Sequence, residues 1–374
     1  MKRLLLLLFL VCTQCHAATT YYVRSTDGND SDDGESVGNA WLTIQKAADT
    51  ITTGSTCLIC ADGTYLPATT IDFDTNGGGV VFKGCAADGT DDNTVATISG
   101  MGGSGYLVAL NHASGSGSFY NLRFTQAKSD AFHFDDGSNY RFFNCEIDNA
   151  TSDGIHVSDS TVGGTLTDCH IHSNGAKGFN QSAATRGNFG IMRCTINGNG
   201  GNGLDTEFLY IYNSIVFDNG GVGLSIDGAN ARVVNTTIFS NSGDGIDCAV
   251  QNAGQLIAHN TILRSNGGYG INTSSSDVQH YYPLKNLCSH NNTSGHIDIN
   301  GGNFPDAGSS SHVYEDPSFV SESGTIDLTP ENSNLYKTIA FATGATSYEY
   351  IGAIQPQCAG GGGDKYPYPR FRGY

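Results

Sequence analysis

The chain has 374 residues and a formal net charge of −18, although only 14% of its residues are charged. This acidity argues against nucleic acid or an anionic membrane as a partner, because both are negatively charged themselves. It is compatible with divalent cations, with neutral glycans or with simple solubility. The 50 glycines favour a turn-rich all-β body, organised as one elongated solenoid rather than as two globular domains.

Residues 1–17 begin with Lys2 and Arg3, continue with an apolar run and end on the small residue Ala17. This pattern is typical of a secretory signal peptide, and we expect cleavage after Ala17. A membrane anchor would need roughly twenty apolar residues, more than this segment has. The mature protein is therefore expected to lack an integral membrane segment and to be secreted or held at the cell surface.

Residues 18–53 are predicted to form an N-terminal cap. Residues 21–23 read as a short strand, and residues 42–51 read as an amphipathic helix that begins at Thr43. A solenoid needs such a cap, because the open edge of its first rung would otherwise invite association.

Residues 54–290 are predicted to form stacked rungs, because one short unit recurs along them. A first landmark, usually polar, recurs at steps of 20 to 26 residues, at Asn121, Asn144, Asp168, Arg193, Asn213, Asn235, Asn260 and Asn286. A second, apolar landmark lies 11 residues after the first in seven copies, at Phe132, Ile155, Phe179, Leu204, Leu224, Ile246 and Ile271. A fixed offset at this period indicates the coils of a parallel β-helix, in which equivalent residues form columns.

Three columns can be assigned, because side chains alternate between the two faces of a strand. The second landmarks form one inward column. A further inward column is Phe124, Ile147, Ile171, Ile196, Val216, Ile238 and Leu263. A third column is Asn174, Asn199, Asn219, Asn241 and Asn266. We expect these asparagines to bond amide to amide at a turn, and to occupy the left-handed backbone that such a turn needs.

The cysteines suggest packing more than chemistry. Cys145, Cys169 and Cys194 fall in one inward column, where a thiol behaves as a small apolar group. Cys57 and Cys60 form a CxxC pair without the second pair that a zinc site would need. A local disulfide among Cys57, Cys60 and Cys85 remains open for an exported protein.

Two terminal segments carry a family resemblance. YYVRSTDGNDSDDG at Tyr21, followed by WLTIQKAAD at Trp41, resembles the opening of exported right-handed parallel β-helix proteins of the pectate-lyase-like superfamily. GSTCLICADGTY at Gly54 resembles their first rung, and DPSFV at Asp316 and IGAIQ at Ile351 resemble their closing segment. The resemblance implies an all-β, single-stranded right-handed parallel β-helix with a short capping helix. It implies no particular activity, since the superfamily contains lyases, hydrolases, epimerases, tailspikes and non-catalytic surface proteins.

The end of the chain divides into two further segments. Residues 291–355 are predicted as the C-terminal rungs and closing segment. Residues 356–374 are predicted as a glycine-rich disordered tail, because they are too polar and too interrupted by glycine and proline to pack.

Candidate functional residues lie on the outward columns beside the second landmark. The residue after each landmark is His133, His156, Asn180, Asp205, Ser225, Asp247 or Asn272. A second outward column lies two residues after this one: Asp135, Ser158, Ser182, Glu207, Asp227, Ala249 and Ser274. A third lies two residues before the landmark: Asp130, Asp153, Lys177, Asn202, Val222, Asp244 and Tyr269. Together these columns predict a polar stripe along one face, on which a long polymer could lie.

Four carboxylates gather within this stripe on three consecutive rungs: Asp205, Glu207, Asp227 and Asp247. Ca²⁺ takes six to eight oxygen ligands, and carboxylates so close together would repel one another without a cation. We therefore predict these four residues as calcium ligands. A solvated acidic face is the simpler alternative.

Lys177 and His156 lie one and two rungs away from Asp205, and these three residues are the predicted catalytic group. The arrangement is similar to that of calcium-dependent polysaccharide lyases. In those enzymes the cation acidifies the proton beside a uronate carboxyl group, and a lysine or arginine removes it. A lysine serves as a base only if its pKa falls towards neutrality, which a nearby cation favours and nearby carboxylates oppose.

Other chemistries find less support in the sequence. Asp205 and Asp247 could form the acid/base pair of a glycoside hydrolase. However, the RIK, GHG and NTD signatures of polygalacturonase-like hydrolases are absent, as are the epimerase DPHD motif and the WIDH and RxPxxR motifs of pectate lyases. A metal cluster of His133, His156, His170 and His172 is disfavoured, because the last two should lie on another face.

The sequence thus predicts an exported, monomeric protein that acts on or binds polysaccharide, most readily an acidic glycan, with calcium as cofactor. The alternative is a non-catalytic surface solenoid with a glycan-binding, adhesive or structural role.

Overall fold

The computed structural model describes residues 19–73, 79–103, 105–110, 116–136, 139–159, 162–182, 187–249, 255–273, 284–299, 319–321 and 327–330. The expected signal peptide, the glycine-rich tail and most of the closing segment lie outside these residues. Among the described residues, no helix is long and apolar enough to cross a membrane.

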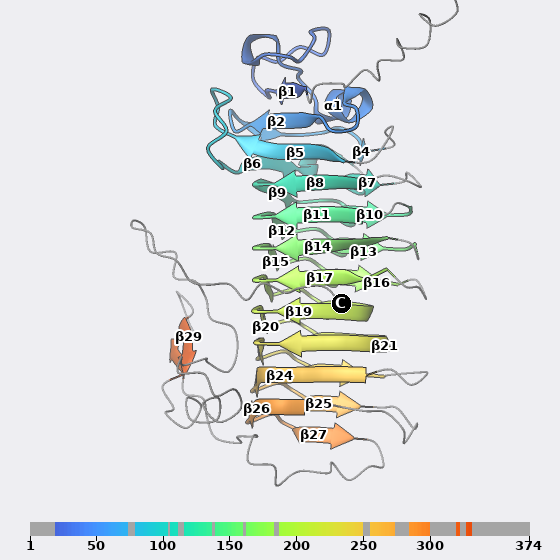
Figure 1. The fold of residues 1–374 in the computed structure, drawn as a ribbon, viewed down its shortest axis with the longest axis vertical. Coiled ribbons are helices and arrows are strands. Elements are labelled where there is room, and N and C mark those ends of the chain that lie inside the picture. Colours follow the sequence, from blue (N-terminus) through green and yellow to red (C-terminus); the bar gives the residue numbers. More distant parts are fainter. Residues whose placement is uncertain are drawn as a thin grey trace, which may run out of the picture.

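The chain winds into a stack of rungs, each of which contributes strands to three parallel ladders (Figure 1). The first ladder contains β1 (Thr20–Val23), β2 (Thr56–Cys60), β5 (Val80–Cys85), β8 (Ser116–Tyr120), β11 (Asn139–Phe143), β14 (Gly163–Thr167), β17 (Phe189–Met192) and β26 (Leu284–His290). The second contains β3 (Thr64–Tyr65), β6 (Ala96–Ser99), β9 (Leu122–Thr125), β12 (Glu146–Asp148), β15 (His170–His172), β18 (Thr195–Asn197), β20 (Ile215–Phe217) and β22 (Thr237–Phe239).

The third ladder contains β4 (Ile71–Asp72), β7 (Val108–Leu110), β10 (Phe132–Phe134), β13 (Ile155–Val157), β16 (Phe179–Gln181), β23 (Ile246–Cys248), β25 (Tyr269–Thr273) and β27 (Gly295–Ile299). Four longer strands take part in two ladders each: β19 (Leu204–Tyr212), β21 (Leu224–Val234), β24 (Gln255–Arg264) and β26, which pairs with both the first-ladder and the second-ladder part of β24. A short antiparallel pair, β28 (Phe319–Ser321) with β29 (Asp327–Pro330), forms a separate sheet.

Both inward columns expected from the sequence are confirmed by the strand register. The column from Phe124 to Leu263 pairs rung by rung on the second ladder, and the column from Phe132 to Ile271 does so on the third. Every member of the two columns is at most 1% exposed. The interior also contains stacked aromatic rings, such as Phe119 on Phe142 with centroids 5.1 Å apart.

The asparagine column is also confirmed, and it is one rung longer than expected. Each side-chain amide donates to the side-chain oxygen of the next rung at 2.9 to 3.0 Å, from Asn174 through Asn266 to Asn292. The expectation of left-handed backbone at these asparagines was wrong. Positive φ falls on the preceding residue, for example Ser173 at 56° and Asp218 at 52°. The asparagine can therefore direct its amide into the stack while its neighbour makes the turn.

A second left-handed position lies at the first landmarks. Asn121, Asn144, Asp168, Arg193, Asn213, Asn235 and Asn260 all have φ between 49° and 56°. Their side chains also connect adjacent rungs: Asn144 donates to Asn121 at 2.9 Å, and Arg193 forms a bidentate pair with Asp168 at 2.7 Å. Asparagine and aspartate tolerate this conformation best, which explains why the landmark is usually one of these residues.

The expected capping elements are present at the N-terminal end. Helix α1 (Ile44–Thr50) begins after Thr43, whose hydroxyl accepts a hydrogen bond from the backbone amide of Lys46 at 3.1 Å. Strand β1 pairs in parallel with β2, and a short 3₁₀ helix η1 (Val37–Asn39) precedes the buried Trp41. A second one, η2 (Gly100–Gly102), follows β6.

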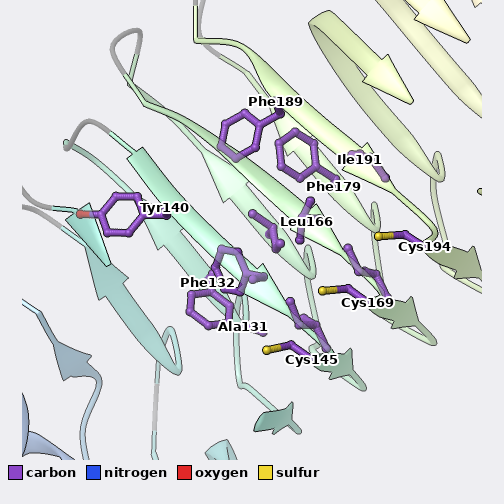
Figure 2. Packing of buried hydrophobic residues seen from close by; sticks show 14 of the residues in the cluster. Ala131, Phe132, Tyr140, Cys145, Leu166, Cys169, Phe179, Phe189, Ile191 and Cys194 are labelled. Atoms are coloured by element: carbon purple, nitrogen blue, oxygen red, sulfur yellow. The ribbon is translucent and has the colours of Figure 1, made fainter. Parts of the chain in front are cut away.

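The stacked thiols are confirmed as core residues. Cys145, Cys169 and Cys194 occupy one column with their sulfur atoms aligned along the stack (Figure 2), and each is at most 2% exposed. Near the N-terminal end, Cys60 and Cys85 are paired residues of β2 and β5, and they form no disulfide. The thiol of Cys85 donates to the sulfur of Cys60 at 3.6 Å.

Candidate functional site

The candidate site lies on the outer surface of the third ladder, over β10, β13, β16 and β19. Each of the first three strands has only three residues, and the side chains of its first and third residues are buried. The middle residue therefore points outward. The register aligns His133, His156, Asn180 and Asp205 in one outward column, as the sequence predicts.

Two buried aspartates fix the turn that leads into these strands. The Oδ1 atom of Asp130 accepts from the backbone amide of Asp153 at 3.0 Å, and Oδ1 of Asp153 accepts from the backbone amide of Lys177 at 2.8 Å. Asn202 connects in the same way to Val222. The Oδ1 atom of each aspartate thus accepts from the backbone of the next rung, while its Oδ2 atom contacts side chains of the outward column.

His133 lies between two carboxylates. Its Nδ1 atom is 3.0 Å from Asp130 Oδ2 and its Nε2 atom is 2.9 Å from Asp135 Oδ1, while Tyr106 stacks on the ring at 4.0 Å between centroids. Burial alone would lower the pKa of His133. The hydrogen bond that the ring donates to Asp130 and the charge of Asp135 outweigh burial and raise this pKa. When the ring is protonated, both of its nitrogens can donate to these carboxylates, which can only accept.

His156 shares Asp130 with His133. Its Nδ1 atom is 3.2 Å from Asp130 Oδ2, and its Nε2 atom is 2.9 Å from the hydroxyl oxygen of Ser182. Burial opposes ionisation of Asp130, but hydrogen bonds from both histidines hold the pKa of this carboxyl far below its usual range. Asp130 is therefore a fixed negative charge at the base of the site.

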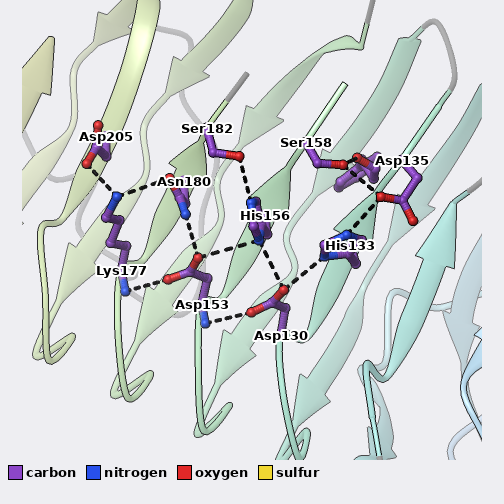
Figure 3. Close-up of polar contacts among 11 residues, drawn as sticks. Asp130, His133, Asp135, Asp153, His156, Ser158, Lys177, Asn180, Ser182 and Asp205 are labelled. Atoms are coloured by element: carbon purple, nitrogen blue, oxygen red, sulfur yellow. Dashed lines mark hydrogen bonds and ion pairs between the residues drawn. The ribbon is translucent and has the colours of Figure 1, made fainter. Parts of the chain in front are cut away.

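Lys177 reaches along the face to the next rung. Its Nζ atom lies 2.6 Å from Asp205 Oδ2 and 3.2 Å from Asn180 Oδ1. Asn180 in turn donates to Asp153 Oδ2 at 2.7 Å. Figure 3 shows the resulting line of contacts through Asp205, Lys177, Asn180, Asp153, His156, Asp130 and His133. The structure thus brings the three predicted catalytic residues together, Lys177 and Asp205 directly and His156 through Asp153.

The remaining expected calcium ligands continue the face beyond Asp205. Burial and the nearby charge of Asp205 raise the pKa of Asp227, and burial together with Asp244 and Asp227 raises the pKa of Asp247. One oxygen of Asp247 is buried without a hydrogen-bond partner. Glu207 lies where the pairing of β19 with β21 shifts register. The charge of Asp205 therefore acts on Asp227, and the charge of Asp227 acts on Asp247.

Tighter groups of potential metal ligands lie elsewhere. Within the described part of the chain, two sets of three side chains bring their ligand atoms within 4.8 Å of one another: Asp130 with His133 and His156, and Glu146 with His170 and His172. The four predicted calcium ligands do not form a third such set, so their role stays a prediction. His170 and His172 lie on β15 of the second ladder, away from His133 and His156, as the sequence predicts.

The sequence placed Asp130, Asp153 and Asn180 on the stripe without a role, and it suggested His133 only as part of a disfavoured histidine cluster. Asp130 and Asp153 recur two residues before the second landmark, and this recurrence could have indicated their role. A short side chain at that position can accept from the backbone amide of the equivalent residue on the next rung. Tyr106 carried no signal, since it lies outside the repeated pattern.

The fold and this polar face define a solenoid of the parallel β-helix class. The model of the right-handed β-helix region matches residues 50–208 and, in a second alignment, residues 108–287. The chain therefore belongs to the right-handed β-helix family.

Two solved structures of similar fold illustrate the class. The crystal structure of pectate lyase Pel9A is 17% identical, with a TM-score of 0.65 over 91% of this chain and 97% of that one. A rhamnogalacturonan lyase is 16% identical, with a TM-score of 0.52 over 83% of this chain and 90% of that one. At these identities the likeness concerns the fold. No curated protein matched the sequence.

Proposed function

We propose that this protein binds an acidic polysaccharide along the third-ladder face and cleaves it by calcium-assisted β-elimination. The observation that carries the proposal is the pairing of Lys177 with Asp205 on an open face that continues into Asp227 and Asp247. The two structures of similar fold, a pectate lyase and a rhamnogalacturonan lyase, support a polysaccharide as the substrate.

The carboxylates beyond Lys177 have the chemistry that a calcium site needs. Burial raises the pKa values of Asp227 and Asp247, nearby carboxylates raise them further, and one buried oxygen of Asp247 has no hydrogen-bond partner. Asp205, Glu207, Asp227 and Asp247 would hold the ion, since hard cations prefer carboxylate oxygens. When bound, calcium would neutralise the substrate carboxylate and acidify the proton on the carbon beside it.

Lys177 would remove that proton once its amine is neutral. The electrons of the C–H bond would form a carbon–carbon double bond, the C–O bond to the next sugar would break, and the leaving oxygen would take a proton from solvent. Asp205 and Asn180 would aim the amine, because both contact its nitrogen. His156 would contribute to the binding face through its contact with Ser182.

A lyase assay tests this proposal. Purified protein is incubated with pectate, rhamnogalacturonan or alginate, with calcium or with a chelator, and the absorbance of the unsaturated product is followed. We expect calcium-dependent product from one of these polymers and none from Lys177→Gln. Lys128→Gln is the matched control, because Lys128 is an exposed lysine outside the contact network. Equal activity in Lys177→Gln would exclude Lys177 as the base.

Non-catalytic glycan binding is a second candidate, and one observation favours it. The nitrogen of Lys177 contacts both Asp205 and Asn180. Held in this way, Lys177 would serve as a fixed positive charge that recognises an acidic sugar. Binding of a polymer without unsaturated product, weakened by Lys177→Gln, would support this function.

We also place this activity outside the cell, on the strength of the signal-like segment 1–17. N-terminal sequencing of the mature protein should begin at residue 18.

A further inference from the structure

We propose that Glu146, His170 and His172 form a binding site for Zn²⁺ or a similar late first-row divalent metal on the outer surface of the second ladder. This site is separate from the third-ladder face and does not depend on the function proposed for it.

The strand geometry presents the three side chains to one point. His170 and His172 are two residues apart on β15, so both point outward from the same strand. Their rings stack with centroids 3.9 Å apart. Glu146 lies on β12, directly opposite His170 in the parallel register. A metal bound here would therefore join two consecutive rungs.

The distances suit a shared metal. One ring nitrogen of each histidine and one carboxylate oxygen of Glu146 lie within 4.8 Å of one another. The Nε2 atom of His172 is 3.0 Å from Oε1 of Glu146. Ligand atoms bound to one zinc ion at about 2.0–2.2 Å lie roughly 3 to 4 Å apart, so small movements of these half-buried side chains would complete the site.

The neighbouring rung supports His170 from outside. Its Nε2 atom is 2.7 Å from Oδ1 of Asn197 on β18. A hydrogen bond to one ring nitrogen fixes the orientation of an imidazole and decides which nitrogen carries the proton, as is usual behind metal-binding histidines. Asn197 is therefore a positioning residue.

The local charge also favours a cation, although Arg123 is close by. Arg123 forms a bidentate pair with Asp148, at 3.1 and 2.7 Å, and the side chain of Asp148 is fully buried. The charge of Arg123 is thus matched by Asp148. Glu146 lies further from Arg123, at 3.6 Å, and its carboxylate is closer to His172, at 3.0 Å.

The ligand types select the metal. Two imidazoles and one carboxylate suit Zn²⁺, Cu²⁺ or Ni²⁺, whereas Ca²⁺ and Mg²⁺ prefer oxygen ligands alone. The side chains of Glu146 and His172 are 35% and 17% exposed, so water can reach the ion and fill its remaining positions. In the cluster of Asp130, His133 and His156, carboxylates contact both nitrogens of His133. His172 contacts only one carboxylate, that of Glu146, and its Nδ1 atom lies 3.1 Å from the hydroxyl oxygen of Ser173.

Titration calorimetry with Zn²⁺ tests the site, on full-length protein that carries no polyhistidine tag and has been treated with chelator. We expect one ion per chain for the wild type, and a tetrahedral-type visible spectrum when Co²⁺ replaces Zn²⁺. His170→Gln with His172→Gln should abolish binding, and Asn197→Ala should weaken it by about tenfold.

His296→Gln is the matched control, because His296 lies on β27 outside both clusters, and it should bind as the wild type does. Glu146→Gln provides an independent check, because it removes a ligand charge while preserving the side-chain shape, and it should weaken binding and alter the Co²⁺ spectrum. The proposal is overturned if the wild type does not bind Zn²⁺, or if the double histidine variant binds it as tightly as the wild type.

Discussion

At the scale of single residues, Asp130 is the organising group of the third-ladder face. Its Oδ1 atom holds the backbone of the next rung and its Oδ2 atom serves two histidines. A side chain with two acceptors and a buried position is needed for both tasks, and asparagine would supply only one acceptor oxygen. The position of Asp130 therefore determines the orientation of His133 and His156 together.

The environment of His133 predicts a pH dependence of stability. Because its folded-state pKa is raised, its contribution is fully present below the ordinary histidine pKa of 6.5 and is lost as the pH rises through the raised value. Asp130 behaves oppositely, since its depressed pKa makes a contribution that is lost only as the pH falls through that low value.

We therefore expect the free energy of unfolding of the wild type to fall above pH 6.5 relative to that of His133→Gln. Denaturant titrations at several pH values provide the measurement. Parallel curves for the two proteins across this range would show that His133 does not titrate with folding.

At the scale of elements, the asparagine ladder shows how turns maintain the register of the strands. Asn219 accepts from Asn199 and donates to Asn241, both at 2.9 Å, and it is 1% exposed. Its amide also contacts the carbonyl oxygen of Ile196. Loss of this side chain would leave polar groups on both neighbouring rungs unsatisfied.

Asn219→Ala should therefore lower the free energy of unfolding by about 1–3 kcal/mol. Thermal or denaturant unfolding followed by circular dichroism would measure the change. Ser242→Ala is the control, because Ser242 is exposed in the adjacent turn and its removal should cost less than about 0.5 kcal/mol. A similar effect for both variants would mean that the ladder contributes no more than a surface turn.

The sequence predicted the strands and columns well, because each rung repeats the same apolar pattern and errors in one copy are corrected by the others. It misplaced the left-handed residue by one position, since Ser173 and Asn174 are both compatible with a turn. The contacts of the site were less predictable. The contacts of Lys177 with Asp205 and of His156 with Asp130 depend on side-chain conformations between neighbouring rungs. The sequence pattern does not determine these conformations.

At the scale of the whole molecule, several acidic residues follow one another along the third-ladder face of an elongated solenoid (Figure 1). Bound calcium would relieve repulsion among Asp205, Glu207 and Asp227, and a ligand that binds only the native state stabilises it by mass action. The melting temperature of the wild type should therefore rise with calcium concentration.

Asp205→Asn combined with Asp227→Asn should abolish this rise and leave the β-sheet spectrum intact. Asp27→Asn combined with Asp49→Asn removes the same charge elsewhere and should preserve the rise. If the wild-type melting temperature does not respond to millimolar calcium, the calcium site and the calcium-assisted reaction are both refuted, and glycan binding becomes the better account of the face.

The stacking of equivalent rungs has a consequence for how such a protein can change over generations. Each rung meets its neighbours through the same columns, so gain or loss of one complete repeat would preserve every pairing and lengthen or shorten the face by about 4.8 Å. A repeat inserted between β16 and β19 would keep the core intact while separating Lys177 from Asp205. Duplication of whole units could therefore alter the recognised length of a polymer, or silence the site, in a single event that leaves the fold unharmed.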